Sequence, residues 1–329
     1  TYILEVLMKK RNLTYVLIVT LTVVFSMAFL PQASKAEYPD KPINFLIPFG
    51  VGGSADLMGR ALAAGAKESL GQPIVPINRP GAGGGIMYTA LKESKADGYT
   101  VGWNSTSILT ATNIGNVPFK YTAFDNVCRI GFTAMPIAVR KDAPWNTLQE
   151  LIDYAKKNPG KIKIGNAGTG SGTHLTAVML EKLADIQVVH VPLGAKRRVP
   201  SCLGGEVQVI CVPLPEAAPQ CLAGQMRLLA VSTEQRDPKF PDVPSMTELG
   251  YPVVMDLFRG ISVPKGTPKS VIQKLVEAFE KGSQDEDFKK IADKKGFNID
   301  FQGNEAFEAY LIEQNKNVVE SLKLGGLTK

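Results

Sequence analysis

The strongest constraint on the fold of this chain is the alternation of short apolar segments with longer amphipathic ones. Residues 42–48 are apolar enough for a buried strand, and the glycine-rich residues 49–54 lead into a helix with apolar side chains at helical spacing. The next strands are expected at residues 73–77 and 99–103, with a helix from 85 to about 94 between them. Strands that alternate with helices predict an α/β fold, in which a parallel or mixed sheet is flanked by helices.

A second series of strands and helices begins near residue 140. Thr147 and Glu150 have the spacing of a capping box, which predicts a helix that starts there and ends at the Asn-Pro-Gly sequence 158–160. The strands expected after this helix are residues 161–165, 188–191, 207–212 and 226–231.

The C-terminal third suggests how the two series are joined. Residues 253–264 are mostly extended and long enough to cross between domains. Helices expected from residue 267 and over 304–324 could then pack back on the first domain. We therefore expect a discontinuous domain 1 made of residues 38–139 and 258–329, and a domain 2 made of residues 140–257.

The first 36 residues read as an export signal. A basic start at residues 8–11 precedes the uncharged run 13–30, and Ser34 and Ala36 are the small residues that a cleavage after Ala36 requires. We expect a signal peptide that is removed, hence a periplasmic protein, with residues 1–7 as an extension before a true start at Met8. A retained membrane anchor is the alternative, because the uncharged run just reaches spanning length.

The charge of the chain argues against a nucleic-acid partner. The formal net charge is +6, and residues 1–36 supply +3 of it, from four basic residues and Glu5. The remaining +3 is small for a nucleic-acid-binding protein, which normally gathers basic residues on one face with aromatic side chains among them.

Cysteine and histidine are too sparse for a metal centre. The chain has two histidines, and its four cysteines show neither a C-x-x-C motif nor a zinc-type Cys/His spacing. A disulfide such as Cys202–Cys221 and the burial of Cys128, Cys202, Cys211 and Cys221 as small apolar residues are both open. We expect no metal.

Two glycine-rich loops, residues 49–56 and 166–174, each join an expected strand to an expected helix. Such loops place unpaired backbone N–H groups at a helix N-terminus, where the aligned peptide dipoles add about half a positive charge. Turn and cap chemistry could explain one loop, but two of them in successive domains favour an anion-binding site. The candidate ligand-binding residues in these loops are Phe49, Gly50, Gly52, Gly53, Ser54, Asp56, Ala167, Gly168, Thr169, Gly170, Ser171, Gly172, Thr173 and His174.

Further candidates come from other strands. On the extended segment 253–264, Phe258 could cover an apolar ligand body and Arg259 could form a two-bond pair with a carboxylate. The alternative places Phe258 in the core and Arg259 on the surface. The remaining candidates, which follow the strands expected at 99–103 and 207–212, are Ser105, Thr106 and Pro213.

Three enzyme motifs are incomplete. Gly50-x-Gly52-x-x-Ala55 matches a dinucleotide fingerprint, but residues 77–79 lack the acidic residue that would hold the ribose. The segment 168–172 lacks the lysine of a P-loop, and no G-x-S-x-G elbow surrounds Ser171. We therefore expect neither a nicotinamide cofactor nor a hydrolase triad.

Eight motifs in order along the chain closely resemble the periplasmic solute receptors of tripartite tricarboxylate transporters, the Bug or TctC-like family. The resemblance extends over nearly all of residues 38–325. The motifs are YPDKPI at 38–43, PF-x-x-GG-x-x-D at 48–56, NRPGAGG at 78–84, DGYT at 97–100, GTGSGTHL at 168–175, HVP at 190–192, LGG at 203–205 and PDVP at 241–244.

The resemblance implies a two-domain clamshell receptor of the type II periplasmic-binding-protein kind. Such a receptor captures a small organic carboxylate and delivers it to the transporter's membrane subunits without catalysis. In this family the two loops hold opposite parts of the ligand, so the resemblance makes residues 49–56 and 167–174 the two sides of the site. We expect a monomer without a cofactor. An exported enzyme acting on an anion, and a sensory receptor for a carboxylate, are the alternatives.

The chain departs from the family pattern at three places. Gly50 and Val51 stand where two prolines are common, which should loosen the first loop. Residues 196–198, Lys-Arg-Arg, replace the small residues that usually follow a Val-Pro-x-x-Gly motif. Two interpretations are open: these side chains add positive charge to a strand-to-helix junction near the cleft, or they form a solvated surface patch. The third departure is Phe258-Arg259-Gly260 on the returning segment.

Overall fold

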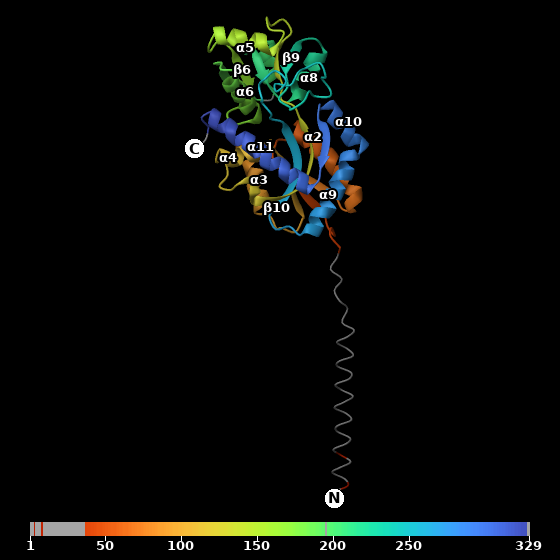
Figure 1. Cartoon of the computed structure of the whole chain (residues 1–329). Helices are drawn as coiled ribbons and strands as arrows, with labels where there is room; N and C mark the ends of the chain where they lie inside the picture. The colour runs from red at the N-terminus through yellow and green to blue at the C-terminus, as the bar shows by residue number, and fades with distance from the viewer. Residues whose placement is uncertain (1–2, 4–7, 9–36, 195, 328–329) are drawn as a thin grey trace. The chain divides into compact units, whose positions relative to one another are not determined.

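The computed structural model describes residue 3, residue 8, residues 37–194 and residues 196–327. The expected signal peptide and its cleavage site lie outside the described residues. Residues 41–329 form one compact unit, which holds two β-sheets with helices around each of them (Figure 1). The expected α/β class is thus confirmed. Within the described part of the chain, no helix combines the length and the apolar character needed to cross a membrane.

The first sheet has six strands in the order β11-β4-β10-β3-β1-β2. β1 runs parallel to β2 and β3, whereas β10 is antiparallel to both β3 and β4, so the sheet is mixed. Its strands are β1 (Ile43–Ile47), β2 (Ile74–Asn78), β3 (Thr100–Ser105), β4 (Phe124–Thr133), β10 (Leu257–Pro264) and β11 (Asn298–Gln302).

Helices cover both faces of the first sheet. One group is formed by α2, α9 and α10, which contact one another, and a second group contains α3, α4 and α11 (Figure 1). Short 3-10 turns lie at Ala82–Gly84 and Tyr121–Ala123. The helices are α2 (Ser54–Leu70), α3 (Gly85–Lys92), α4 (Thr106–Asn113), α9 (Lys269–Gln284), α10 (Glu286–Lys294) and α11 (Asn304–Leu324).

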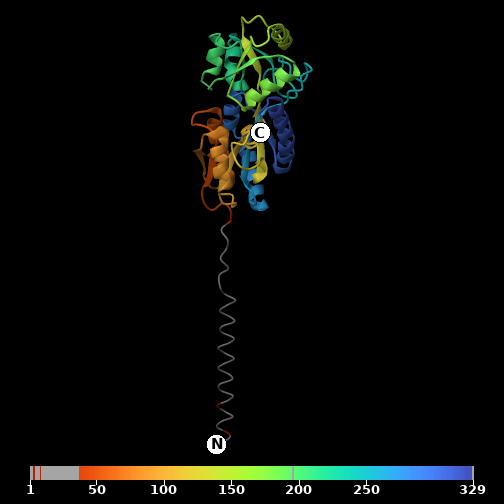
Figure 2. The same ribbon diagram turned by 90° about the vertical axis from the view of Figure 1, so that its left-hand side faces the viewer.

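The second sheet has five strands in the order β7-β6-β8-β5-β9. In both views it lies with its helices beside one end of the first sheet (Figures 1 and 2). Its strands are β5 (Ile137–Arg140), β6 (Lys163–Asn166), β7 (Val189–Pro192), β8 (Val209–Cys211) and β9 (Met226–Ala230). Its helices are α5 (Leu148–Lys157), α6 (Gly172–Leu183), α7 (Arg198–Leu203) and α8 (Leu214–Leu222).

Local sequence explains where several of these helices begin and end. Gly71 ends α2 in a left-handed conformation, at φ 66°, and its N–H donates to the carbonyl of Lys67. The Thr147 hydroxyl accepts a hydrogen bond from the N–H of Glu150 at the start of α5, as the capping-box spacing predicts.

Three elements were not expected from the sequence: α4, α10 and β11. The apolar run 130–139 also divides into two strands, because β4 ends at Thr133 and β5 begins at Ile137 in the other sheet. The polypeptide returns to the first sheet at Leu257, which pairs with Thr133. Both connections between the sheets therefore lie side by side. The domain boundaries at 139/140 and 257/258 stay a prediction.

The core of the first sheet is aromatic. Phe45 of β1 lies 5.7 Å from Trp103 of β3 in an edge-on arrangement, and 5.9 Å from Phe279 of α9, measured between ring centroids. All three side chains are fully buried. This packing fixes the end of β1, from which the first glycine-rich loop emerges.

Candidate functional site

The two glycine-rich loops line one cavity of about 550 Å³. The first loop connects β1 to α2 and the second connects β6 to α6, so the cavity is lined from both sheets. Apolar side chains form part of its wall, among them Met58, Ile114, Met135 and Leu257. A cavity of this size with a few polar groups is typical of a small-molecule site.

Asp56 holds the first loop in place rather than lining the cavity. It is buried, and its carboxylate accepts hydrogen bonds of 2.9 Å from the N–H of Gly52 and from the side chains of Asn78 and Arg60. Burial by itself would raise the pKa of Asp56, but these hydrogen bonds outweigh it and lower the pKa below its ordinary value. Asp56 is therefore a carboxylate that orders the loop.

The second loop is ordered in the same way by its own side chains. The N–H of Gly168 donates to Asn166, the N–H of Ala167 donates to Thr173, and the Ser171 hydroxyl caps α6 by accepting from the N–H of His174. Three backbone N–H groups that the sequence suggested as ligand donors therefore donate to side chains of the loop itself.

Some helix N-terminal donors remain for a ligand. Within the described part of the chain, the N–H groups of Ser54 and Ala55 in α2, and of Gly172 and Thr173 in α6, have no acceptor. All four residues line the cavity. Two helix N-termini with unpaired donors therefore face the same space, which favours an anion there.

His174 lies behind the second loop, and its Nδ1 accepts a hydrogen bond of 3.3 Å from the N–H of Gly170. Its ring is edge-on to that of His190, whose Nε2 lies 2.9 Å from Glu181. Burial, and then the neighbouring His190, lower the pKa of His174 to about 4. The ring is therefore neutral at pH 7 and can act as the acceptor for Gly170.

Arg259 is the one cavity-lining cation without a partner in the described part of the chain. It lies on β10 opposite Ser105, has 7% of its surface exposed, and its Nη1 has no hydrogen-bond acceptor. The guanidinium lies 5.4 Å from the ring centroid of Phe49. Burial lowers its pKa to about 10, so it remains charged at pH 7. A buried charge that lacks a counter-ion is costly unless an anion completes it.

A second arginine lines the cavity from the other sheet. Arg198, the first residue of α7, is 5% exposed, and its Nη2 donates to Oε1 of Glu216 at 2.8 Å. Lys196 and Arg197 of the same basic segment are exposed, and Arg197 pairs with Glu206 instead. Of the three basic residues in this segment, only Arg198 lines the cavity, and the other two are exposed.

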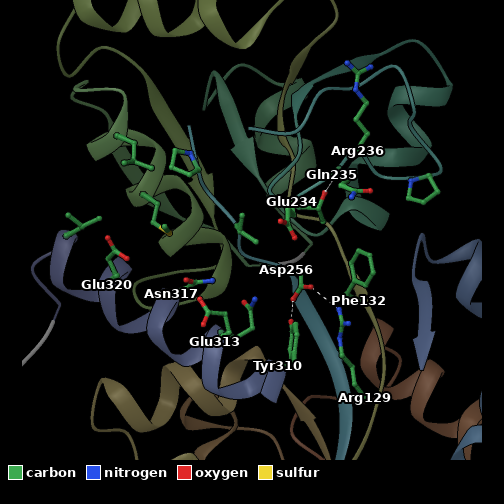
Figure 3. A pocket seen from close by; sticks show the side chains of 18 residues that line it. Arg129, Phe132, Glu234, Gln235, Arg236, Asp256, Tyr310, Glu313, Asn317 and Glu320 are labelled. Atoms are coloured by element: carbon green, nitrogen blue, oxygen red, sulfur yellow. Dashed lines mark hydrogen bonds and ion pairs between the residues drawn. The ribbon is translucent and has the colours of Figure 1, made fainter. Parts of the chain in front are cut away.

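A second cavity, of about 790 Å³, has a different electrostatic character (Figure 3). Its buried arginine, Arg129, pairs with Asp256 at 3.1 Å and Asp300 at 2.5 Å, and Asp256 also accepts a hydrogen bond from Tyr310. The other charged side chains that line it are Glu234, Arg236, Glu313 and Glu320. With its arginine already neutralised and more acidic than basic groups, this cavity does not suit an anion.

Thirteen of the nineteen candidate residues line the first cavity. They are Phe49, Gly53, Ser54, Thr106, Ala167, Gly168, Thr169, Gly170, Ser171, Gly172, Thr173, Pro213 and Arg259.

The other six candidates lie outside the lining. Phe258 is fully buried against Phe307 and Tyr310, which is the core placement. Ser105 is the N-cap of α4 and accepts from the N–H of Ser107. The remaining four, which belong to the two glycine-rich loops, are Gly50, Gly52, Asp56 and His174.

Sequence reasoning missed lining residues that come from distant segments. Gly83, Thr110 and Asn116 reach the cavity, and so do Thr133, Pro215 and Glu216. The isolated positions carry no local signal, because their places depend on how the sheets pack. The Asn-Arg-Pro-Gly-rich segment 78–84 could have indicated Gly83, since it is a third glycine-rich loop after a strand.

Cysteines and metal ligands carry no site in the described part of the chain. All four cysteines are free, and Cys128, Cys202 and Cys211 are buried. Of the two alternatives left open by the sequence, the disulfide between Cys202 and Cys221 is therefore not formed. No group of three or more histidine, cysteine, aspartate or glutamate side chains suited to a metal ion occurs among the described residues.

Known proteins resemble the chain over most of its length. The family model for "Tripartite tricarboxylate transporter family receptor" matches residues 58–324. The "UPF0065 protein in gbd 5'region" of Cupriavidus necator is 32% identical over 311 residues, covering 92% of this chain and 94% of that protein. A TctC solute-binding protein from Polaromonas has 31% identity and a TM-score of 0.78, covering 87% of this chain and 99% of that one. The periplasmic binding protein BugD has 32% identity and a TM-score of 0.75, covering 89% and 100%.

Proposed function

The chain belongs to the tripartite tricarboxylate transporter family of receptors, and we propose that its 550 Å³ cavity captures a small organic carboxylate for delivery to the transporter's membrane subunits. The family resemblance indicated by the sequence motifs is thereby confirmed. As a receptor of this family the protein works in the periplasm. Removal of a signal peptide after Ala36, a monomeric state and the absence of catalysis are parts of the proposal.

The observation that carries the proposal is the unpaired, buried guanidinium of Arg259 in a cavity lined by two helix N-termini. A carboxylate there accepts hydrogen bonds from Arg259 and from the free N–H groups of α2 and α6. Asp56 and His174 do not touch this ligand. They act as positioning residues, because each holds one loop through a backbone N–H.

Binding couples the two sheets because the loops that hold the anion come from different sheets. We propose two lobes, one built on each sheet, that close over the ligand about the paired connections at Thr133 and Leu257. Contacts that exist only in the closed form are what shifts the open and closed populations. The membrane subunits would bind the closed form of the receptor.

The direct test is a thermal-shift screen of residues 37–329 against mono-, di- and tricarboxylates, amino acids and aromatic acids. A ligand at about 100 times its dissociation constant should stabilise the protein by about 2.7 kcal/mol. The ligand should be recovered unchanged after incubation, which separates a receptor from an enzyme. If the folded protein responds to no carboxylate in the screen, the proposed function is wrong.

A further inference from the structure

The pair formed by Arg198 and Glu216 is incomplete on both sides. One hydrogen bond of 2.8 Å joins Nη2 of Arg198 to Oε1 of Glu216. In the part of the chain that the structure describes, Nε of Arg198 and Oε2 of Glu216 are buried without a hydrogen-bond partner. Both residues line the ligand cavity.

In the neighbouring pair of Arg197 and Glu206, both carboxylate oxygens have hydrogen-bond partners. Nη2 of Arg197 contacts both carboxylate oxygens, at 2.9 and 3.2 Å, and the Ser201 hydroxyl donates to Oε2 of Glu206. That pair is exposed to solvent, whereas the side chain of Arg198 is 6% exposed. The Glu216 side chain is 27% exposed, against 51% for Glu206, so the less complete pair is the more buried one, where an unsatisfied group costs more.

Two cations line the cavity together with Glu216: Arg198, which pairs with it from α7, and Arg259 on β10. Burial raises the pKa of Glu216 to about 7, and the charge of Arg198 only partly opposes the rise. The carboxyl group is thus close to the point at which it takes up a proton at neutral pH.

We propose that Arg198 is a second anion-binding group, and that an anionic group of the ligand takes the place of Glu216 beside it while Glu216 takes up one proton from the solvent. The inference rests on the proposed function, since it concerns the same cavity. The favoured ligand is a dicarboxylate, with one carboxylate at Arg259 and the other at Arg198, so that each sheet supplies one arginine. The proton balances the exchange, because an uncharged carboxylic acid replaces a carboxylate next to the new anion.

This exchange makes affinity depend on pH. At pH 6 Glu216 already carries most of its proton while the dicarboxylate is still largely ionised, so affinity should level off near this pH. Above pH 7 each pH unit should weaken dicarboxylate binding about tenfold, which is the slope for uptake of one proton. A monocarboxylate that occupies only the Arg259 side should lack this slope.

The experiment is calorimetric titration of residues 37–329 with succinate, glutarate and adipate, and with the matched monocarboxylates butyrate, valerate and hexanoate. At pH 8, two buffers of different ionisation enthalpy measure the proton uptake directly. We expect uptake of about one proton with the best dicarboxylate, and none with its monocarboxylate partner.

Two variants make the test specific. Glu216→Gln is neutral at every pH, so it should bind the dicarboxylate about tenfold more tightly than wild type at pH 8, equally at pH 6, and without proton uptake. Arg198→Met should lose the preference for the dicarboxylate while it keeps its affinity for the monocarboxylate. Arg197→Met, which removes the adjacent exposed arginine, is the control. It should leave the affinity for the dicarboxylate, the preference over the monocarboxylate and the proton uptake unchanged.

The outcomes separate this inference from the proposed function. Equal affinity for dicarboxylates and monocarboxylates, or proton uptake that persists in Glu216→Gln, would overturn the inference and leave the receptor function standing. Failure of both series and of the wider screen to bind would overturn the proposed function, and the inference with it.

Discussion

Arg129 and Arg259 are similarly buried, with 4% and 7% of their surfaces exposed, yet they have opposite roles. Arg129 is neutralised by Asp256, as Figure 3 shows, and by Asp300, so its charge stabilises the fold. Arg259 has an aromatic ring beside it but no carboxylate in the described part of the chain. A buried cation kept without a counter-ion lowers stability, and the proposed ligand would offset that cost.

Replacement of Arg259 by Met should therefore stabilise the empty protein and abolish carboxylate binding. We expect the free energy of unfolding to rise by about 1–3 kcal/mol, the usual cost of a buried polar group left without a partner. Urea denaturation and calorimetric titration measure the two effects. Arg129→Met is the matched control and should lose about 3–5 kcal/mol, because it leaves Asp256 and Asp300 unpaired. An Arg259→Met protein that binds normally would remove this residue from the site.

The depressed pKa of His174 predicts a loss of stability in acid. The unfolded chain has the ordinary pKa of 6.5, whereas the folded protein has about 4, so between these values the unfolded state binds more protons. Stability should fall as the pH drops through this window. His174→Asn removes the titration and retains an acceptor for the N–H of Gly170, so unfolding curves from pH 7 to pH 4 should show a smaller decline. An equal decline in both proteins would contradict the assignment.

At the scale of elements, each of the two loops contains a glycine in a left-handed conformation. Gly52 of the first loop has φ +79°, and nothing lies within 4 Å of a Cβ added there. Gly170 has φ +76°, a left-handed conformation that other residues adopt at a cost, and an added Cβ would lie 3.1 Å from Ile114. Both loops therefore depend on glycine for their conformation, and of these two positions only Gly170 also lacks room for a side chain.

Gly170→Ala should weaken ligand binding, because the cavity-lining loop must shift to accommodate the methyl group. Gly160→Ala is the matched control. Gly160 has φ +72°, no neighbour within 4 Å of an added Cβ, and no place in the cavity lining. Both changes should cost about 1–2 kcal/mol of stability from backbone strain, but only Gly170→Ala should raise the dissociation constant. Equal binding by the two variants would show that the loop is only a turn.

At the scale of the whole molecule, the two connections between the sheets separate the two cavities. Thr133 and Leu257, which pair with each other, line the ligand cavity, whereas their neighbours Phe132 and Asp256 line the larger acidic one. A rotation about these connections changes both cavities together. We therefore expect closure of the lobes to change the shape of the ligand cavity and of the cavity in Figure 3 at the same time.

Ligand binding should make the protein more compact. We expect the radius of gyration of residues 37–329, measured by small-angle X-ray scattering, to decrease when a ligand identified in the screen is added at saturation. Arg259→Met in the same concentration of ligand should show no change. A decrease in that variant, or none in wild type, would contradict ligand-driven closure of two lobes.

Much of the fold, and the place of both glycine-rich loops in the cavity wall, followed from the sequence because their signals are local. Apolar spacing predicted α2, and glycine-rich segments after apolar strands indicated both loops of the cavity. These features depend on backbone conformation and on contacts within a few residues, so they can be read from neighbouring positions. Elements with weaker periodicity, such as β11, were missed.

Tertiary structure alone decided which charges are paired. Nothing in the local sequence distinguishes Arg129, which meets Asp256 and Asp300 from distant segments, from Arg259, which meets neither. The same holds for Arg198, which faces the cavity while Lys196 and Arg197 face solvent. The burial of a charged side chain and the presence of a counter-ion beside it both depend on segments that are far apart in sequence. Together they determine whether the charge forms an ion pair that stabilises the fold or stays available to bind an anion.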